Sequence, residues 1–155
     1  NVYEQTGTGP LLTINIEMKN SVSLYPGLEE QVLRLAVEQR MQDRIQLSSF
    51  NHYSLVLAVR LISQMKLAVP CGPLYDCWLV EPWQYARSHG FAAIHPLYAS
   101  LQDLPLVSRC HEAGVAVNAW TIDVPEHQAL AIRLGIDAII TNLPDQARTI
   151  LQQMQ

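Results

Sequence analysis

Glu17 and Lys19 are the residues of this chain whose types and spacing point most directly to chemistry. They stand at the end of an apolar run that begins at Leu11. Residues two apart on a β-strand point to the same side, so the carboxylate and the ammonium project together. Carboxylate oxygens ligate hard cations, and a lysine ammonium is a point charge suited to an anion. The pair therefore predicts a site for a metal ion and an anion at the end of a strand.

Other side chains at expected strand ends are candidates to shape this site. Trp120 can form a wall with its ring and offer its single N–H donor, and Phe50 can pack beside the site, although a core position fits both. His95 also ends a strand, where a structural, hydrogen-bonded role is expected. The remaining histidines are interpreted as capping, surface or structural residues: His52, His89, His111 and His127. No Gly-x-Ser-x-Gly sequence occurs, so no Ser-His-Asp arrangement is predicted.

Apolar runs that alternate with amphipathic segments must position these residues. The runs predict six β-strands: Leu11–Glu17, Ile45–Phe50, Ala68–Gly72, Ala92–His95, Val115–Thr121 and Ala138–Thr141. Leu28, Val32, Leu35 and Ala36 set a helical stripe after the first strand. Glycines and prolines mark helix ends and starts at Gly114, Gly135, Pro125 and Pro144. The alternation predicts an α/β fold with a parallel sheet.

Two parallel architectures fit this alternation, an open doubly wound sheet and a TIM (β/α)₈ barrel. The starts of the last four strands recur every 23 or 24 residues, which favours the barrel. No Gly-rich phosphate loop follows a strand, which weakens the doubly wound alternative. A complete barrel needs about 250 residues, whereas this chain has 155 residues and six expected strands. The barrel interpretation therefore predicts that strands are missing.

The amino-acid composition argues against a disordered, a nucleic-acid-binding or a membrane-spanning protein. Apolar residues make up 49% of the chain and charged residues 15%, a balance that excludes disorder and favours strands buried on both faces. The net charge of −4 gives no indication of a basic surface that would bind nucleic acid. No apolar run is long enough for a transmembrane segment. Three cysteines without zinc-type spacing are expected to be reduced thiols.

Several motifs, taken in order along the chain, resemble one family. They are Asn15-Ile16-Glu17-Met18-Lys19, Tyr25-Pro26-Gly27-Leu28-Glu29-Glu30, Ser48-Ser49-Phe50-Asn51, Ile94-His95-Pro96, His111-Glu112-Ala113-Gly114, Val117-Asn118-Ala119-Trp120-Thr121 and the stretch from Gly135 to Asp145. This ordered set is similar to the glycerophosphodiester phosphodiesterases. Their fold is a TIM barrel, and they use a divalent cation to hydrolyse glycerophosphodiesters to an alcohol and glycerol 3-phosphate.

The resemblance implies roles for particular residues. Glu17 would be a ligand of a divalent cation, Mg²⁺ or Ca²⁺, and Lys19 would contact the phosphate. Trp120 and Phe50 would bind the glycerol part of the substrate. The family's Ala-His-Arg-Gly, Glu-x-Asp and His-Asp motifs supply the acid and base histidines and two metal-binding carboxylates. They do not occur here, so no catalytic residue is expected in this chain. Residues 1–155 are therefore expected to be the C-terminal portion of an incomplete barrel, about strands three to eight, inactive alone.

The expected function of the parent protein is glycerophosphodiester hydrolysis in glycerophospholipid metabolism. Its expected partner is a small-molecule glycerophosphodiester, with no nucleic acid and no transmembrane segment. Two alternatives stay open: a non-catalytic barrel relative that acts as a binding module, and a phospholipase D-like enzyme whose mouth would be apolar near Trp78 and Trp83. The cytoplasm is the expected location, with the periplasm and secretion as alternatives.

Overall fold

Six parallel strands form the centre of the molecule. The computed structural model describes residues 13–102 and 105–154. The strands are β1 (Ile14–Glu17), β2 (Ile45–Ser49), β3 (Cys71–Tyr75), β4 (Ala93–Pro96), β5 (Ala116–Ala119) and β6 (Ala138–Ile139). They lie in one sheet in the order β1-β2-β3-β4-β5-β6, and each pairs in parallel with the next.

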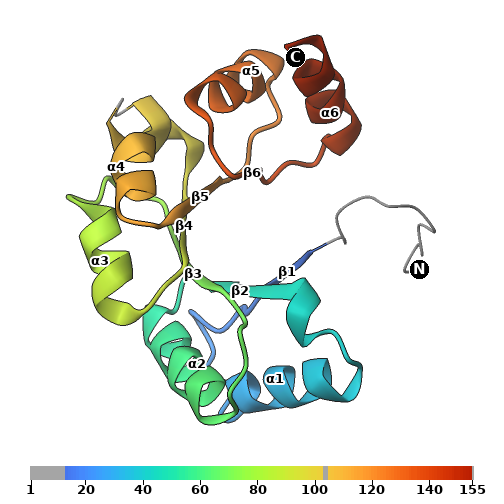
Figure 1. Ribbon diagram of the computed structural model, residues 1–155, viewed down its shortest axis with the longest axis vertical. Coiled ribbons are helices and arrows are strands. Elements are labelled where there is room, and N and C mark those ends of the chain that lie inside the picture. The colour runs from blue at the N-terminus through green and yellow to red at the C-terminus, as the bar shows by residue number, and fades with distance from the viewer. Residues whose placement is uncertain (1–12, 103–104, 155) are drawn as a thin grey trace.

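Six α-helices connect and cover the strands. They are α1 (Leu28–Glu38), α2 (His52–Gln64), α3 (Pro82–His89), α4 (Leu106–Glu112), α5 (Pro125–Leu134) and α6 (Pro144–Gln153), with short 3₁₀ helices η1 (Gln42–Arg44) and η2 (Tyr98–Gln102). The sheet is curled, and the helices follow one another around its outer side (Figure 1). Within the described residues, β1 and β6 are the two edges and do not pair with each other.

This arrangement decides between the two architectures. A doubly wound sheet reverses its strand order at a switch point and carries helices on both faces. Here every strand is the neighbour of the next in sequence, and the helices lie on one side of the curl (Figure 1). The fold is therefore an α/β half-barrel of six parallel strands, and the doubly wound alternative is excluded.

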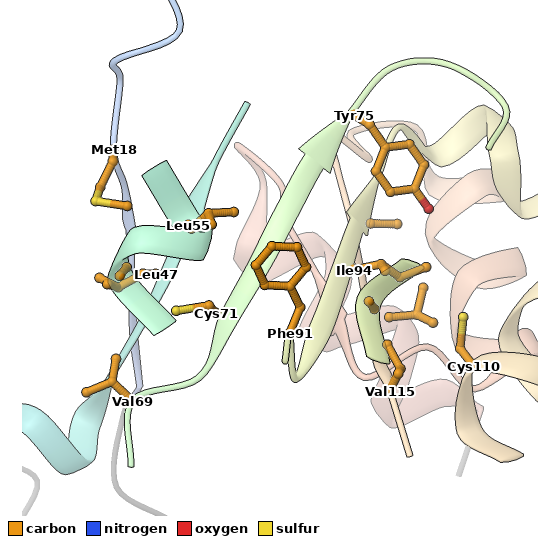
Figure 2. Close-up of a cluster of buried hydrophobic side chains, with 14 of the residues drawn as sticks. Met18, Leu47, Leu55, Val69, Cys71, Tyr75, Phe91, Ile94, Cys110 and Val115 are labelled. Carbon is orange, nitrogen blue, oxygen red and sulfur yellow. The ribbon is translucent and has the colours of Figure 1, made fainter. Parts of the chain in front are cut away.

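Side chains alternate between two different surfaces along the strands. The core lies between the sheet and the helices and is filled by apolar side chains such as Leu47, Cys71 and Ile94 (Figure 2). On the concave side, the same strands carry mostly small or polar residues in register: Glu17 pairs with Ser48, Ser48 with Gly72, and Asn118 with Ala138. His95 on this face pairs with an apolar residue, Leu74. The concave face is thus more polar than the face that packs against the helices.

The predicted strands are all present, but their bounds differ. The largest error is β3, predicted at Ala68–Gly72 and found at Cys71–Tyr75. Ala68 and Pro70 are exposed, whereas all five residues of β3 are buried. Pro73, one residue past the predicted end, lies in register with Ser49, because a proline removes only its own N–H from the ladder. The start of the first predicted strand, residues 11–12, lies outside the described residues.

The predicted stripe on α1 is confirmed at three of its four residues. Ala36 is buried and Leu28 and Val32 pack against the core, whereas Leu35 is 56% exposed. Glu29 and Leu33 are also buried on this helix. Glu29 is buried because it has polar partners on the loop and helix that it faces. Hydrophobic periodicity cannot anticipate such a buried carboxylate.

The predicted helix boundaries at glycine and proline are confirmed. Gly135 ends α5 with φ 73°, and Gly114 follows α4 with φ 71°, both in the left-handed conformation that glycine adopts readily. Pro125 and Pro144 are the first residues of α5 and α6. Within the described ranges, no helix combines the length and apolarity required to cross a bilayer.

Candidate active site at the carboxyl end of the sheet

Glu17 and Lys19 meet at the end of β1. The Lys19 Nζ donates to Glu17 Oε1 at 3.0 Å, so the two side chains project together as the strand period predicts. The Lys19 side chain is 79% exposed and that of Glu17 33%. A pair this open to water contributes little to stability, about 0–1 kcal/mol. Both groups therefore remain accessible to a ligand.

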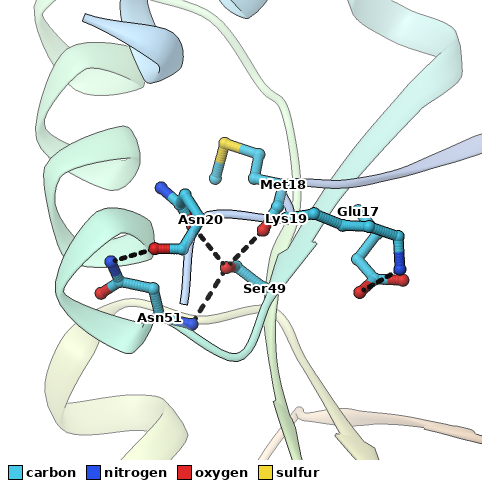
Figure 3. Close-up of polar contacts among 6 residues, drawn as sticks. All are labelled: Glu17, Met18, Lys19, Asn20, Ser49 and Asn51. Carbon is cyan, nitrogen blue, oxygen red and sulfur yellow. Dashed lines mark hydrogen bonds and ion pairs between the residues drawn. The ribbon is translucent and has the colours of Figure 1, made fainter. Parts of the chain in front are cut away.

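A buried polar network holds the loop that carries Lys19. Ser49 Oγ lies 2.7 Å from the carbonyl oxygen of Met18 and 3.0 Å from Asn20 Oδ1, and it accepts from the backbone N–H of Asn51 (Figure 3). Asn51 Nδ2 donates to the carbonyl oxygen of Asn20 at 3.2 Å. The ends of β1 and β2 are thereby tied together on both sides of Lys19. Sequence reasoning missed this network, because its partners are about 30 residues apart in the chain and meet only when β1 pairs with β2.

The same network reaches the first turns of two helices. Asn20 Nδ2 donates to Ser54 Oγ at 2.8 Å, and Ser54 in turn donates to Glu29. Asn51 Oδ1 accepts from the backbone N–H of Ser54 and caps α2. Burying Asn20, Glu29 and Ser54 is tolerated because each is hydrogen-bonded. The β1–α1 loop is consequently fixed to the sheet where Glu17 and Lys19 emerge.

Phe50 and Trp120 come together from strands that are not neighbours. Phe50 follows β2 and Trp120 follows β5, yet their rings meet edge to face, with centroids 5.4 Å apart and planes at 84°. Edge-to-face contact is a favoured aromatic geometry. Because β3 and β4 lie between them in the sheet, the contact spans the concave side at its carboxyl end. The two predicted aromatic residues therefore lie together at the carboxyl end of the concave face, which we call the opening of the half-barrel.

The expected role of the Trp120 N–H is not supported. Trp120 Nε1 donates to the carbonyl oxygen of His95 at 2.7 Å, so it is already engaged within the protein. Only the ring of Trp120 is left to contact a ligand. The hydrogen bond instead fixes the ring orientation against β4.

His95 lies buried on the concave face and has the structural bond expected of it. Its Nε2 accepts from Asn118 Nδ2 at 3.1 Å, and Asn118 also lies 3.4 Å from Gln46 Oε1. Burial lowers the pKa of His95 to about 4, so the ring is neutral near pH 7. Its Nδ1 has no partner within the described residues, nor has the buried hydroxyl of Ser48. Sequence reasoning identified the bonded histidine but not the partners on β2 and β5.

A second polar cluster ties the ends of β5 and β6 together. Asp123 Oδ1 accepts from Thr141 Oγ1 and the backbone N–H of Asn142, and Oδ2 accepts from Asn142 Nδ2, each at 2.8 Å. These hydrogen bonds, those from Asn142 foremost, lower the pKa of Asp123. The carboxylate is therefore used to fix the loop after Trp120.

Glu17 offers the right chemistry for a hard cation but only part of a ligand set. Mg²⁺ and Ca²⁺ take about six or more oxygen ligands. Across residues 13–102 and 105–154, no group of three or more His, Cys, Asp or Glu side chains is arranged to hold a metal ion. Glu17 can therefore contribute one ligand, and the described residues alone do not form a complete metal centre.

A groove between α2 and α3 adjoins Phe50. It has a volume of about 550 Å³ and is lined by Ser21, Phe50, Asn51, His52, Tyr53, Val56, Tyr85 and His89. His52, expected to be a capping or surface residue, instead bridges two elements. Its Nε2 donates to the carbonyl oxygen of Leu74 at 2.8 Å, and Tyr85 O–H donates to its Nδ1 at 2.9 Å. The groove wall between α2 and α3 is thus held in place.

Known proteins are similar to this chain in sequence and in fold. The sequence profile of the Glycerophosphoryl diester phosphodiesterase family matches residues 2–146. A glycerophosphodiester phosphodiesterase from Caldanaerobacter subterraneus subsp. tengcongensis is 39% identical over 145 residues, which cover 93% of this chain and 57% of that protein. The chain therefore spans little more than half the length of this relative.

Solved structures of similar proteins carry the same curled sheet. A glycerophosphodiester phosphodiesterase from Parabacteroides distasonis matches with a TM-score of 0.75 and 25% identity, over 92% of this chain and 58% of that one. An Oleispira antarctica phosphodiesterase, solved with the product sn-glycerol-3-phosphate, matches with a TM-score of 0.69 and 20% identity, over 90% of this chain and 55% of that one.

Proposed function

The chain belongs to the glycerophosphoryl diester phosphodiesterase family, and we propose that its parent protein hydrolyses glycerophosphodiesters to an alcohol and sn-glycerol 3-phosphate. The observation that carries the proposal is the Glu17–Lys19 pair, which stands exposed at the carboxyl end of a half-barrel of this family. Active sites of (β/α)₈ barrels lie at this end of the strands. The relative bound to sn-glycerol-3-phosphate supports the class of product.

In this proposal the six strands are strands three to eight of a TIM barrel, and residues 1–155 are its C-terminal portion. Two facts support it. Within the described residues the sheet stays open between β1 and β6, and the chain covers 57% of its Caldanaerobacter relative. The acid and base histidines and the other metal-binding carboxylates would come from strands one and two.

Glu17 would ligate a divalent cation, Mg²⁺ or Ca²⁺, and Lys19 would contact a non-bridging phosphate oxygen. The carboxylate fits a hard cation, and its incomplete ligand set fits a site shared with further strands. A divalent cation bound there would stabilise the charge that develops on the phosphate oxygens. Lys19 adds positive charge to the same group, and its 3.0 Å contact with Glu17 keeps the two functions adjacent.

Phe50 and Trp120 would enclose the glycerol part of the substrate. Their edge-to-face contact fixes both rings at the opening, where they can exclude water from the reacting phosphate. Since the Trp120 N–H is bonded to His95, these rings would recognise the carbon skeleton rather than the hydroxyl groups.

Substitution of Glu17 in the parent enzyme tests the proposal. Glu17→Gln keeps the size of the side chain but removes its charge, so we expect weaker binding of Mg²⁺ or Ca²⁺ in calorimetry and a fall in kcat of about 100-fold or more, roughly 3 kcal/mol. Glu30→Gln is the matched control, because Glu30 is an exposed glutamate paired only with Arg34 on α1. Near-normal turnover and metal affinity in Glu17→Gln would remove Glu17 from the site.

The isolated chain provides a second test. If the acid and base histidines lie on other strands, the purified 155-residue chain should release no sn-glycerol 3-phosphate from glycerophosphocholine, with or without added metal. Robust metal-dependent release by this chain would refute the proposed division of the barrel.

A further inference from the structure

Ser48 is a buried serine whose hydroxyl is unpaired within the described residues. The residue has no exposed surface, and its Oγ has no hydrogen-bond partner. Leaving a buried polar group unpaired is unfavourable, and native proteins seldom do so. Ser49, the next residue of β2, points to the other face and is equally buried, yet its hydroxyl bonds to Met18 and Asn20. The unpaired hydroxyl of Ser48 therefore needs an explanation that the packing of β2 does not give.

The register of the sheet places Ser48 beside Glu17. Ser48 pairs with Glu17 on β1 and with Gly72 on β3, so the three residues form one row across the concave face. Neighbouring strands lie only about 4.8 Å apart. Side chains in register on one face are therefore direct neighbours, and the Ser48 hydroxyl lies next to the carboxylate that is the candidate metal ligand.

Among the described residues, the other neighbours of Ser48 on this face offer it no free acceptor. Gly72 has no side chain, and the His95 ring fills the space beside it, since a Cβ on Gly72 would lie 2.5 Å from His95 Cδ2 and 2.7 Å from Nε2. Cδ2 carries only a C–H, and Nε2 already accepts from Asn118. Two residues back on β2, Gln46 Oε1 lies 3.4 Å from the same Asn118 amide. The β3 side of the row therefore covers the hydroxyl without pairing it.

Glu17 is the neighbour that has an acceptor available. Lys19 Nζ donates to Oε1, whereas Oε2 has no hydrogen-bond partner in the part of the chain that the structure describes (Figure 3). The Glu17 side chain is 33% exposed, so it can turn without displacing the core. Hydrogen bonds to an ionised carboxylate are roughly twice as strong as those between neutral groups. Glu17 is thus the acceptor that suits the Ser48 hydroxyl best.

We propose that Ser48 is a positioning residue: when a divalent cation binds, its hydroxyl donates a hydrogen bond to the Glu17 carboxylate and orients it toward the metal. This inference rests on the proposed function, because it needs Glu17 to be a metal ligand. Carboxylates that bind metals are themselves held by hydrogen bonds, and loss of one such partner weakens metal affinity or activity about 10- to 100-fold. Without the metal the hydroxyl stays buried and unpaired, so the site lowers the stability of the metal-free protein.

Ser48→Ala in the parent enzyme should change stability and metal affinity in opposite directions. Because the lost hydroxyl is unpaired, the thermal unfolding midpoint of the metal-free enzyme should stay equal or rise by about 2–4 °C. The Kd for Mg²⁺ or Ca²⁺ in calorimetry should rise about tenfold or more. Ser49→Ala is the matched control for stability and should lower the midpoint, since its hydroxyl is bonded. Ser108→Ala, exposed on α4, is the control for metal affinity and should bind like the unaltered enzyme.

Two results for Ser48→Ala would overturn the inference. A lower unfolding midpoint of the metal-free variant would show that the hydroxyl already has a partner in the folded enzyme. An unchanged metal affinity would show that Glu17 does not use the hydroxyl. Either result leaves the proposed function intact if Glu17→Gln loses metal binding. Normal metal binding by Glu17→Gln would instead overturn the proposed role of Glu17 and this inference with it.

Discussion

His95 is a buried neutral imidazole, and this makes it a pH-dependent part of the fold rather than an exposed acid or base. Burial lowers its pKa to about 4 in the folded protein, against about 6.5 in an unfolded chain. Between these two pKa values, His95 is protonated in the unfolded state and neutral in the folded state. The stability that depends on neutral His95 is therefore complete above about pH 6.5 and is lost as the pH falls toward the folded value.

We predict that the free energy of unfolding falls by on the order of 1–3 kcal/mol between about pH 6.5 and pH 4 through this residue. His95→Gln keeps a polar side chain but cannot titrate, so its unfolding free energy should change less over that range. Urea unfolding at a series of pH values measures the difference. Equal pH dependence in the variant and the unaltered protein would contradict the assignment.

Gly72 makes room for the His95 ring. A Cβ on Gly72 would lie 2.5 Å from His95 Cδ2 and 2.7 Å from Nε2, and the ring cannot move away freely because Asn118 is bonded to it. Gly72→Ala should destabilise the protein by about 1–3 kcal/mol, the usual cost of overpacking. Adding His95→Ala should recover part of the loss, which a double-mutant cycle of unfolding free energies detects. Strictly additive effects would mean that the ring does not limit this position.

At the scale of elements, two helices end in a conformation that their residues disfavour. Arg40 follows α1 and Lys66 follows α2, both with φ 55°. Each stands where Gly114 and Gly135 end the later helices without strain. The turns still close, because the residues after them donate back to Ala36 and Ile62. These hydrogen bonds accompany the left-handed conformation of both residues.

Replacing these residues with glycine should stabilise the protein. We predict a gain of about 0.5–1 kcal/mol for Arg40→Gly and for Lys66→Gly, because relief of the left-handed strain exceeds the added flexibility of the unfolded chain. Thermal unfolding measures the change. Gln39→Gly serves as the control, since Gln39 has φ −86° and should lose stability. A loss in the Arg40 and Lys66 variants as well would show that their side chains contribute more than the strain costs.

At the scale of the whole molecule, stability should be graded across the sheet. Strands β2 to β5 each pair on two sides, whereas β1 and β6 pair on one side within the described residues. Large buried side chains also concentrate on the central strands, among them Leu47, Ile94 and Val117. The edges should therefore open locally before the centre does.

Hydrogen exchange measures this gradient in the 155-residue chain. We predict that the backbone amides of β1 and β6 exchange faster than those of β3 and β4, by a factor that grows with the stability of the centre. The central strands should exchange only in global unfolding. Uniform protection across all six strands would contradict the gradient and would indicate that both edges are covered in solution.

The sequence alone determined the order of strands and helices, the family and the main candidate residues. Local rules suffice for these, because the strand period places Glu17 beside Lys19 and because glycine and proline set helix ends at Gly135 and Pro125. The bounds of β3 were wrong, since burial of Pro73 depends on its neighbours in the sheet.

Only the tertiary structure decided which side chains meet across the concave face of the curled sheet and which polar groups are buried. It joined Phe50 to Trp120 across two intervening strands, engaged the Trp120 N–H with His95 and buried Glu29 against Ser54. These contacts join residues that are distant in sequence, so no local pattern predicts them. They form, and stabilise the fold, only after the sheet has curled and brought the loops together.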